Sequence, residues 1–226
     1  MKRAKALQAL VDTIESVDCP HPLRVGIDGV DCAGKTVLAD ELAELLRARG
    51  REVVRASLDG FHNPRAVRHR RGRASPEGYY LDSFDLDTLL SALLLPLGPS
   101  GNRRFRTAAY DWRKDEKVYA PVRTAGGSSV LLFDGIFLQR PELAGCWDLS
   151  VYVQVGLDTA LRRGMRRDGE ALGGSERAAE AYRLRYIPAQ RRYIRTHRPH
   201  ERADVVFGND YPDYPQAVFD SRLSEG

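Results

Sequence analysis

The segment Gly29–Thr36, which reads GVDCAGKT, decides the fold class of this chain. It matches the pattern G-x-x-x-x-G-K-[ST], in which glycines let the backbone curl until several N–H groups point at phosphate oxygens. The preceding LRVGID (residues 23–28) predicts a buried strand, and the following KTVLADELAELLRARG predicts a helix that stops at Gly50. A strand, a loop and a helix in this order predict a phosphate site at a helix amino terminus, where the dipole favours anions.

Each position of this loop has a chemical task, which predicts a nucleoside-triphosphate site. Lys35 can reach the β- and γ-phosphates, and the Thr36 hydroxyl can bind Mg²⁺. The chain has no N-K-x-D guanine-reading signature, which argues against a GTPase and leaves an ATPase or a kinase open. The predicted cofactor-binding residues are Gly29, Val30, Asp31, Cys32, Ala33, Gly34, Lys35, Thr36 and Val37.

Helix and strand patterns alternate outward from this loop. Strands are predicted at residues 23–28, 52–57, 128–135, 148–155 and 203–207, and helices at 5–17, 35–49, 85–95, 157–167 and 176–196. Residues 59–80 have no clear periodicity, which is typical of a functional or mobile loop, and 97–127 predict a hairpin or an irregular excursion. The alternation predicts an α/β, three-layer P-loop NTPase fold with a central, mainly parallel sheet and helices on both faces.

Composition limits the class of protein. The 226 residues are 42% hydrophobic and 29% charged, with a net charge of +4, as in a globular domain. The three cysteines include no C-x-x-C pair, which argues against a disulfide framework and a thiolate zinc site. The longest apolar run stops at Pro96, so no membrane association is predicted, and a cytoplasmic location is expected. The basic run Arg65–Arg73 contains no aromatic residue that would stack on bases, so no nucleic-acid partner is predicted.

Two aspartates follow predicted strands. Asp59 comes just after the strand at 52–57, and Asp134 closes the apolar strand VLLFD. Ligands of open α/β sheets bind outside the carboxyl ends of the strands, so both side chains should lie beside the phosphates. Asp59 is positioned to accept the proton of a substrate hydroxyl or to help hold Mg²⁺, and Asp134 to approach Mg²⁺ directly or through water.

The chain resembles the uridine kinase and phosphoribulokinase family of small-molecule kinases. The resemblance runs from about Leu23 to Asn209 and rests on an ordered set of blocks: GIDGVDCAGKTVLADELAE, SLDGFH, SFDLD, AAYDW, VLLFDGIF, RRGMRRD and RYIPAQRRYI…ADVVF. It implies an ATP- and Mg²⁺-dependent kinase that phosphorylates a primary hydroxyl. It also implies one P-loop kinase domain over 1–226, with a lid at 157–175 and acceptor-side insertions at 59–80 and 97–127.

The resemblance also implies residue roles. Asp59 would be the general base that activates the substrate hydroxyl. Lys35 would act in catalysis by offsetting charge on the γ-phosphate. Asp85 would hold sugar hydroxyls, and Tyr110 would contact the acceptor. Phe61 and His62, from the SLDGFH block, are further expected substrate-binding residues. Asp134 stands where uridine kinases usually carry a glutamate, one methylene longer, so a water-mediated contact to Mg²⁺ is expected, with Thr36 as the other metal-binding residue.

The basic helix at 157–167 carries the remaining catalytic candidates. Arg163 and Arg167 are spaced i, i+4 and therefore share one helix face, beside the parallel pair Arg162 and Arg166. In the family, this block belongs to a lid whose arginines stabilise charge on the transferring phosphoryl group. The Gly173–Gly174 pair would be the flexible edge of that lid.

The acceptor-side blocks differ from those of uridine kinases. Asp115 or Lys114 stands near the position of the histidine that reads the pyrimidine ring, and the glycine–arginine pair after the lid block is replaced by Gly173–Gly174. The leading expectation is a nucleoside acceptor that resembles uridine or cytidine. One alternative is a kinase of the same family that acts on pantothenate or a sugar. The other is a P-loop nucleotide-binding regulator. The sequence allows a homo-oligomer.

Overall fold

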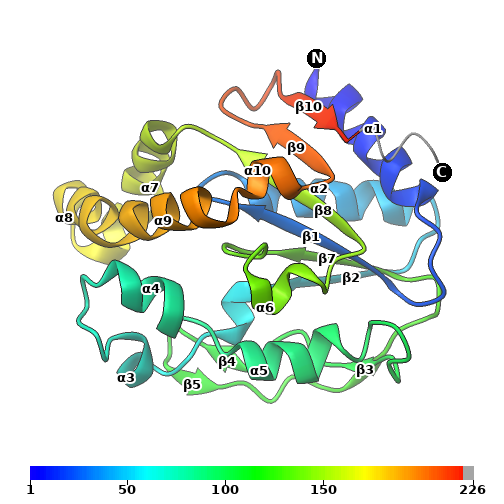
Figure 1. The fold of residues 1–226 in the computed structure, drawn as a ribbon, viewed down its shortest axis with the longest axis horizontal. Coiled ribbons are helices and arrows are strands. Elements are labelled where there is room, and N and C mark those ends of the chain that lie inside the picture. The colour runs from blue at the N-terminus through cyan, green and yellow to red at the C-terminus, as the bar shows by residue number, and fades with distance from the viewer. Residues whose placement is uncertain (221–226) are drawn as a thin grey trace.

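A six-stranded sheet forms the centre of the molecule. The computed structural model describes residues 1–220. The strands follow the order β10-β9-β8-β1-β7-β2 (Figure 1). Their bounds are β1 Leu23–Gly29, β2 Val53–Ser57, β7 Val130–Asp134, β8 Leu149–Gln154, β9 Val205–Gly208 and β10 Gln216–Phe219. Strands β1, β2, β7, β8 and β9 are parallel to one another, and β10 pairs antiparallel with β9. The predicted mainly parallel sheet is therefore confirmed.

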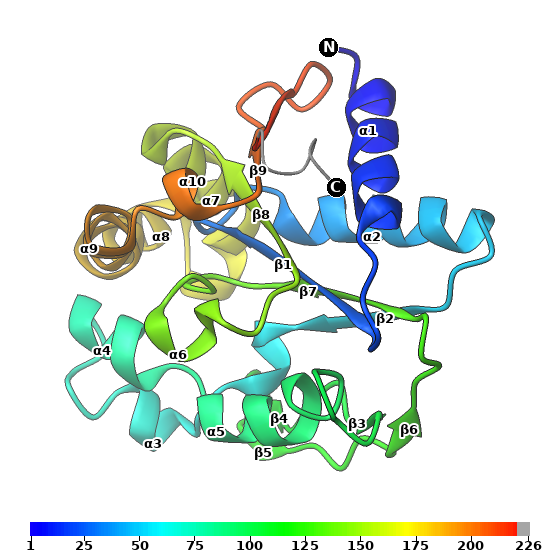
Figure 2. The same ribbon diagram turned by 45° about the vertical axis from the view of Figure 1, so that its right-hand side comes forward.

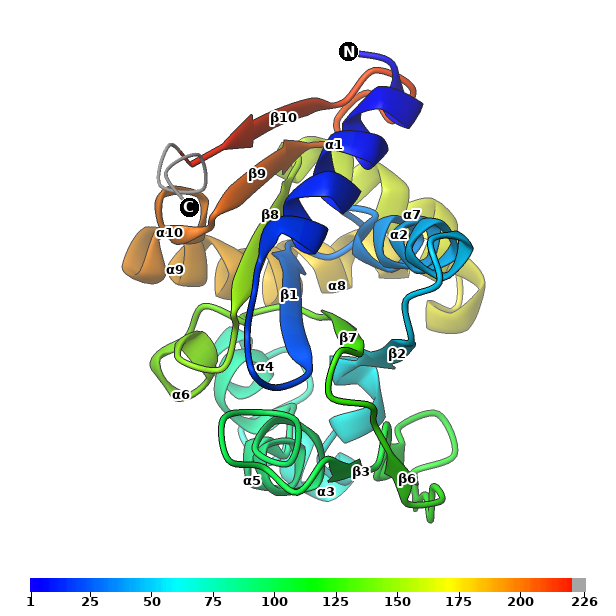
Figure 3. The ribbon, with the colours of Figure 1, turned by 90° about the vertical axis from the view of Figure 1, so that its right-hand side faces the viewer.

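Helices cover both faces of the sheet because successive residues of each strand point to opposite sides. On β7, Val130 and Leu132 belong to one apolar core, and Leu131 and Phe133 belong to the other. The first core is covered by α1 (Arg3–Ser16), α2 (Lys35–Ala48) and α7 (Leu157–Leu172). The second is covered by α4 (Pro76–Asp82), α6 (Pro141–Ala144) and α9 (Ile187–His197) (Figure 3).

The acceptor-side segments carry more regular structure than expected. Residues 59–80 contain the 3₁₀ turn η1 (Leu58–Phe61), α3 (Arg65–Arg68) and the start of α4. After α5 (Leu86–Leu89) and the π turn η2 (Leu90–Leu94), residues 97–127 form two small antiparallel sheets of two strands each, a hairpin and a pair of strands that encloses it in the chain. The hairpin is β4 (Tyr110–Asp111) with β5 (Glu116–Lys117), and the enclosing pair is β3 (Arg104–Phe105) with β6 (Arg123–Thr124). The helical segments η1, α3, α5 and η2 have only four or five residues each, which is too few for a 3.6-residue period to show in the sequence.

The carboxyl-terminal part differs from prediction in two ways. The long helix expected at 176–196 is divided into α8 (Ser175–Ala181), the π turn η3 (Tyr182–Tyr186) and α9, followed by α10 (Pro199–Arg202). Pro188 lacks the N–H for an α-helical bond to Leu184, and a π turn is one way to accommodate that loss. The strand at 203–207 is not the last, because β10 follows it with an alternating, half-exposed pattern.

Helices α7, α8 and α9 lie together at the end of the sheet where β1 finishes (Figures 1 and 2). They therefore stand over the P-loop, which follows β1 directly. Among residues 1–220, no helix combines the length and the apolar character that a bilayer span requires.

Candidate active site

The P-loop joins β1 to α2 at the carboxyl edge of the sheet. Gly34 takes a φ of +96°, and a Cβ at this position would lie 2.5 Å from Nδ2 of Asn209, so only glycine fits. That amide donates to the Ala33 carbonyl at 2.7 Å. Lys35, which is buried, donates from Nζ to the Val30 carbonyl at 2.8 Å. The loop thus keeps its lysine folded against its own backbone.

Asp31 connects the P-loop to two distant helices. Its Oδ2 accepts hydrogen bonds from Tyr79 Oη at 2.8 Å and from Gln190 Nε2 at 2.7 Å, and its N–H donates to Gln190 Oε1. Burial raises the pKa of Asp31, while the positive charge of Lys35 opposes that rise. Gln190 and Tyr79 were not among the predicted residues, because no local pattern marks a partner so far along the chain.

Thr36 and Asp134 meet at the start of α2. The Thr36 hydroxyl donates to Asp134 Oδ2 at 2.7 Å, and the Ser57 hydroxyl lies 3.4 Å from the same oxygen. Arg55 occupies the other oxygen, Oδ1, at 3.0 Å, and it also pairs with Asp40. The hydroxyl and carboxylate oxygens are donors that a hard divalent cation prefers, and Arg55 offsets part of the charge of Asp134.

Asp59 and Tyr110 line one hollow of about 240 Å³, together with Gly60, Trp112 and Val118 among others. Asp59 is exposed, and within the described residues its carboxylate has no hydrogen-bond partner. The Tyr110 hydroxyl donates to Asp115 Oδ1 at 3.0 Å. A free carboxylate beside an open hollow is accessible to a hydroxyl-bearing ligand.

The two other residues of the SLDGFH block have different surroundings. Phe61 is fully buried and packs near Phe133, with ring centroids 6.5 Å apart, so its side chain does not reach the hollow. The His62 ring packs near Trp112, 5.6 Å between centroids, and its Nδ1 lies 3.0 Å from the Asp59 carbonyl oxygen. Burial is the main reason that the pKa of His62 lies below its usual value.

Asp85 lies beside the same block. Its N–H donates to the Phe61 carbonyl at 2.8 Å, and its carboxylate caps α5 through Thr88 N and Thr88 Oγ1 at 3.0 and 2.7 Å. A carboxylate has about four lone-pair positions, so a cap of this kind leaves capacity for ligand hydroxyls.

The α7 arginines have protein partners. Arg163 donates to the Cys32 carbonyl at 3.3 Å and to the Asn209 carbonyl at 2.8 Å, so its charge lies against the P-loop. Arg167 is exposed and pairs with Asp168 at 2.8 Å. Although burial acts to raise it, the pKa of Asp168 lies below the usual value, because Arg167 and Tyr182 donate to it.

The structure therefore gathers most of the predicted site residues at one edge of the sheet. Thr36, Lys35 and Asp134 lie together, and Asp59 lines the hollow with Tyr110. Val37 is exposed one residue further along α2. Sequence reasoning missed the residues that hold the loop in place, namely Arg55, Gln190 and Asn209.

Comparison with known proteins gives a consistent result. A sequence profile described as the phosphoribulokinase / uridine kinase family matches residues 25–211. The uridine-cytidine kinase B of Dictyostelium discoideum is 27% identical over 188 residues, which are 82% of this chain and 74% of that protein. The uridine kinase of Saccharomyces cerevisiae is 28% identical over 148 residues, 65% of this chain and 29% of that longer protein.

Solved structures agree with this result. The structure of a possible uridine kinase from Bacillus stearothermophilus superposes with a TM-score of 0.71 at 25% identity. The superposition covers 90% of this chain and 97% of that one.

Proposed function

The chain belongs to the phosphoribulokinase / uridine kinase family, and on that premise we propose that its acceptor is a nucleoside, uridine or cytidine. Family membership makes the protein an ATP-dependent kinase that transfers phosphate to a hydroxyl of a small molecule. The choice of nucleoside rests on one observation: the Dictyostelium uridine-cytidine kinase aligns with 82% of the chain.

ATP binds with its phosphates on the P-loop. The N–H groups of Gly29–Val37 and the amino terminus of α2 face the phosphate oxygens. Lys35 leaves the Val30 carbonyl and turns to the β- and γ-phosphates. Exchanging one hydrogen bond for a charge-assisted contact with phosphate favours that movement.

Thr36 and Asp134 would hold Mg²⁺, because their oxygens suit this cation. The ion would offset negative charge on the β- and γ-phosphates. Asp134 keeps Arg55 on Oδ1 and offers Oδ2. Because Arg55 reduces the net charge of Asp134 and this side chain is short, Asp134 would contact the cation through a water molecule.

Asp59 receives the proton in the transfer. The primary hydroxyl of the nucleoside sits in the hollow beside Asp59 and Tyr110, and its oxygen attacks the γ-phosphorus of ATP. The bond to the β–γ bridging oxygen breaks, ADP leaves, and the hydroxyl proton passes to the Asp59 carboxylate. Asp85 holds the ribose hydroxyls, and His62 borders the acceptor as a neutral ring.

The α7 arginines complete the site. Residues 157–175 form a lid that closes on bound ATP, and Arg163 and Arg167 then approach the γ-phosphate, where charge spreads over its oxygens during transfer. The Gly173–Gly174 pair is its edge, since both residues have positive φ, +84° and +121°.

An ATP-consumption screen tests this function. We expect turnover with uridine or cytidine that falls by about 10²–10⁴-fold in Asp59→Asn, the usual contribution of a general base. The affinity for ATP should be unchanged. Asp213→Asn, at an exposed position between β9 and β10 that does not line the hollow, is the matched control. Turnover restricted to pantothenate or a sugar would replace the nucleoside, and activity retained in Asp59→Asn would remove the general base.

A further inference from the structure

A second cluster of reactive side chains lies at the opposite edge of the sheet. Cys19 and His21 belong to the loop between α1 and β1, and Asp148 directly precedes β8. One ligand atom from each, a sulfur, a ring nitrogen and a carboxylate oxygen, lies within 4.8 Å of the other two. These residues lie near the amino ends of β1 and β8, whereas the P-loop follows the carboxyl end of β1.

The spacing of the cluster is close to that of a metal site. His21 Nε2 is 3.8 Å from Asp148 Oδ1. Around a tetrahedral zinc ion, bonds of about 2.0–2.3 Å put neighbouring ligand atoms about 3.3–3.6 Å apart. Because the three atoms lie within 4.8 Å of one another, a shift of about 1.5 Å or less would bring them to that spacing.

The His21 ring is oriented as a ligand. Its Nδ1 lies 3.1 Å from the Pro22 carbonyl oxygen. A carbonyl oxygen can only accept, so Nδ1 carries a proton, and in the neutral ring the lone pair is on Nε2, which faces Asp148. Metal-binding histidines almost always donate their second ring N–H to such an oxygen, which fixes the tautomer.

Arg24 holds the carboxylate of the cluster in place. Its Nε and NH2 groups donate to Asp148 Oδ2 and Oδ1 at 3.0 and 2.9 Å, and its backbone N–H donates to Oδ2 at 2.8 Å. Oδ1 accepts one of these bonds and retains a lone pair on the side of His21. Arg24 therefore orients Asp148 but also lowers the net charge of this carboxylate. A metal bound here would draw most of its affinity from Cys19 and His21.

Cys19 is the soft donor. Its Sγ donates to the His21 carbonyl at 3.0 Å, so the thiol already faces this loop. Burial, followed by the nearby carboxylates of Asp148 and Asp18, raises its pKa. A metal ion that binds the sulfur displaces the thiol proton to solvent.

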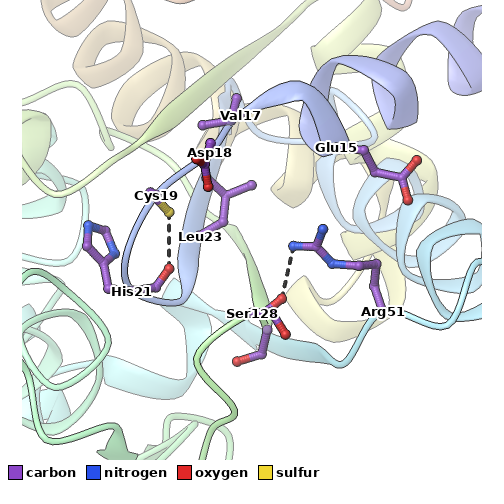
Figure 4. Close-up of a pocket in the computed structure, with 9 residues that line it drawn as sticks. Glu15, Val17, Asp18, Cys19, His21, Leu23, Arg51 and Ser128 are labelled. Atoms are coloured by element: carbon purple, nitrogen blue, oxygen red, sulfur yellow. Dashed lines mark hydrogen bonds between the residues drawn. The ribbon is translucent and has the colours of Figure 1, made fainter.

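A hollow of about 300 Å³ adjoins the cluster. Cys19 and His21 lie on one side of it and Arg51 on the other (Figure 4). It provides an access route and room for a water molecule as the fourth ligand. Although the absence of a C-x-x-C pair argues against a thiolate zinc site, the fold brings one cysteine beside a histidine and an aspartate. We propose that Cys19, His21 and Asp148 form a zinc site at this edge, with an open fourth position. The mixed set of sulfur, nitrogen and oxygen ligands suits Zn²⁺ better than Mg²⁺, the cation of the kinase site. This proposal does not depend on which molecule the kinase phosphorylates.

Cobalt titration of the full chain tests the site. Excess Mg²⁺ is present so that it occupies sites made only of oxygen ligands and keeps Co²⁺ from binding there. We expect a near-ultraviolet thiolate-to-Co²⁺ charge-transfer band that saturates at one equivalent and is abolished by Zn²⁺. The band should be absent in Cys19→Ser, and His21→Gln should bind Co²⁺ at least tenfold more weakly. Cys146→Ser, a half-buried thiol outside the cluster, is the matched control and should keep the band.

Thermal unfolding supplies a readout independent of the cobalt spectrum. Zn²⁺ should raise the Tm of the wild type and of Cys146→Ser, but not that of Cys19→Ser, since only a ligand of the folded state stabilises it. Circular dichroism without metal checks that the variants fold, and His21→Gln serves if Cys19→Ser does not. A wild type without the charge-transfer band, a band that survives in Cys19→Ser, or equal loss in Cys146→Ser would overturn the site.

Discussion

Single side chains at the kinase site are held by partners that limit what they can do. Asp134 illustrates this, because Thr36 and Ser57 face one of its oxygens while Arg55 occupies the other. A carboxylate shared in this way has less free charge than an isolated one. The Thr36 and Asp134 oxygens are nevertheless already side by side, so little rearrangement is needed before a cation binds.

His62 makes stability depend on pH. Burial lowers its folded-state pKa, with Arg68 and Arg185 adding to the effect and Asp59 opposing it. The unfolded chain, whose histidine has a pKa of about 6.5, therefore takes up a proton first as pH falls. The contribution of His62 is fully present above about pH 6.5 and is lost as pH falls through the folded-state pKa.

We accordingly expect the urea-derived free energy of unfolding to decline between about pH 7.5 and pH 5.5. The decline should be shallower in His62→Gln. In His200→Gln, a partly exposed control on α10, it should match that of the wild type. Equal slopes in the wild type and in His62→Gln would assign the pH dependence to other groups.

At the scale of elements, the contact between α7 and the π turn η3 places Tyr182 next to the P-loop. The Tyr182 hydroxyl donates to Asp168 at 2.7 Å and lies 3.2 Å from Cys32 Sγ. Its ring rests on Gly164 so closely that a Cβ there would lie 2.2 Å from a ring carbon. The π turn therefore sets the distance between the proposed lid and the phosphate loop.

A paired substitution on α7 tests this packing. Gly164→Ala should lower the free energy of unfolding by about 1–3 kcal/mol, because the added methyl overpacks the site and displaces Tyr182. Gly169→Ala, on the same helix, meets only Ser175 at 3.6 Å and should gain up to about 1 kcal/mol from helix propensity. Denaturant unfolding measures the free energy of unfolding of both variants. Similar values for the two would show that Tyr182 can move away from residue 164 without destabilising the protein.

At the scale of the molecule, segments from the two ends of the chain meet at the P-loop. Arg3, on α1, pairs with Glu41 of α2 and donates to Asn209 Oδ1 at 3.2 Å. Asn209 follows β9 and donates to the Ala33 carbonyl at 2.7 Å. The loop that binds phosphate is thus supported by the first helix and by the segment after the fifth parallel strand.

Asn209→Ala should weaken ATP binding by about tenfold. The substitution removes a buried hydrogen bond worth about 1–1.5 kcal/mol and leaves the Ala33 carbonyl unpaired, so the loop becomes less ordered before ATP binds. Calorimetric titration of ATP measures the change. Asn102→Ala, in an exposed turn, should leave the affinity unaltered, and an unaltered affinity in Asn209→Ala would show that α2 alone supports the loop.

Several features were determined by the sequence itself. GVDCAGKT, the stop at Gly50 and the alternation of strands and helices depend on residues that are neighbours in the chain, and the structure confirms the fold they predict. The family could be identified from ordered blocks for the same reason, and a profile match over residues 25–211 agrees with it. The catalytic roles of Asp59, Arg163 and Arg167 stay predictions.

Other features were decided only by the tertiary structure. Asp31 with Gln190, and Asp148 with His21, are pairs whose members lie far apart in sequence, so no spacing rule could join them. The antiparallel β10 and the burial of Phe61 likewise depend on what packs beside them. Local patterns encode backbone geometry and the side of an element that is apolar. Which distant side chains meet follows from the order of strands in the sheet, and that order is settled only when the whole chain packs.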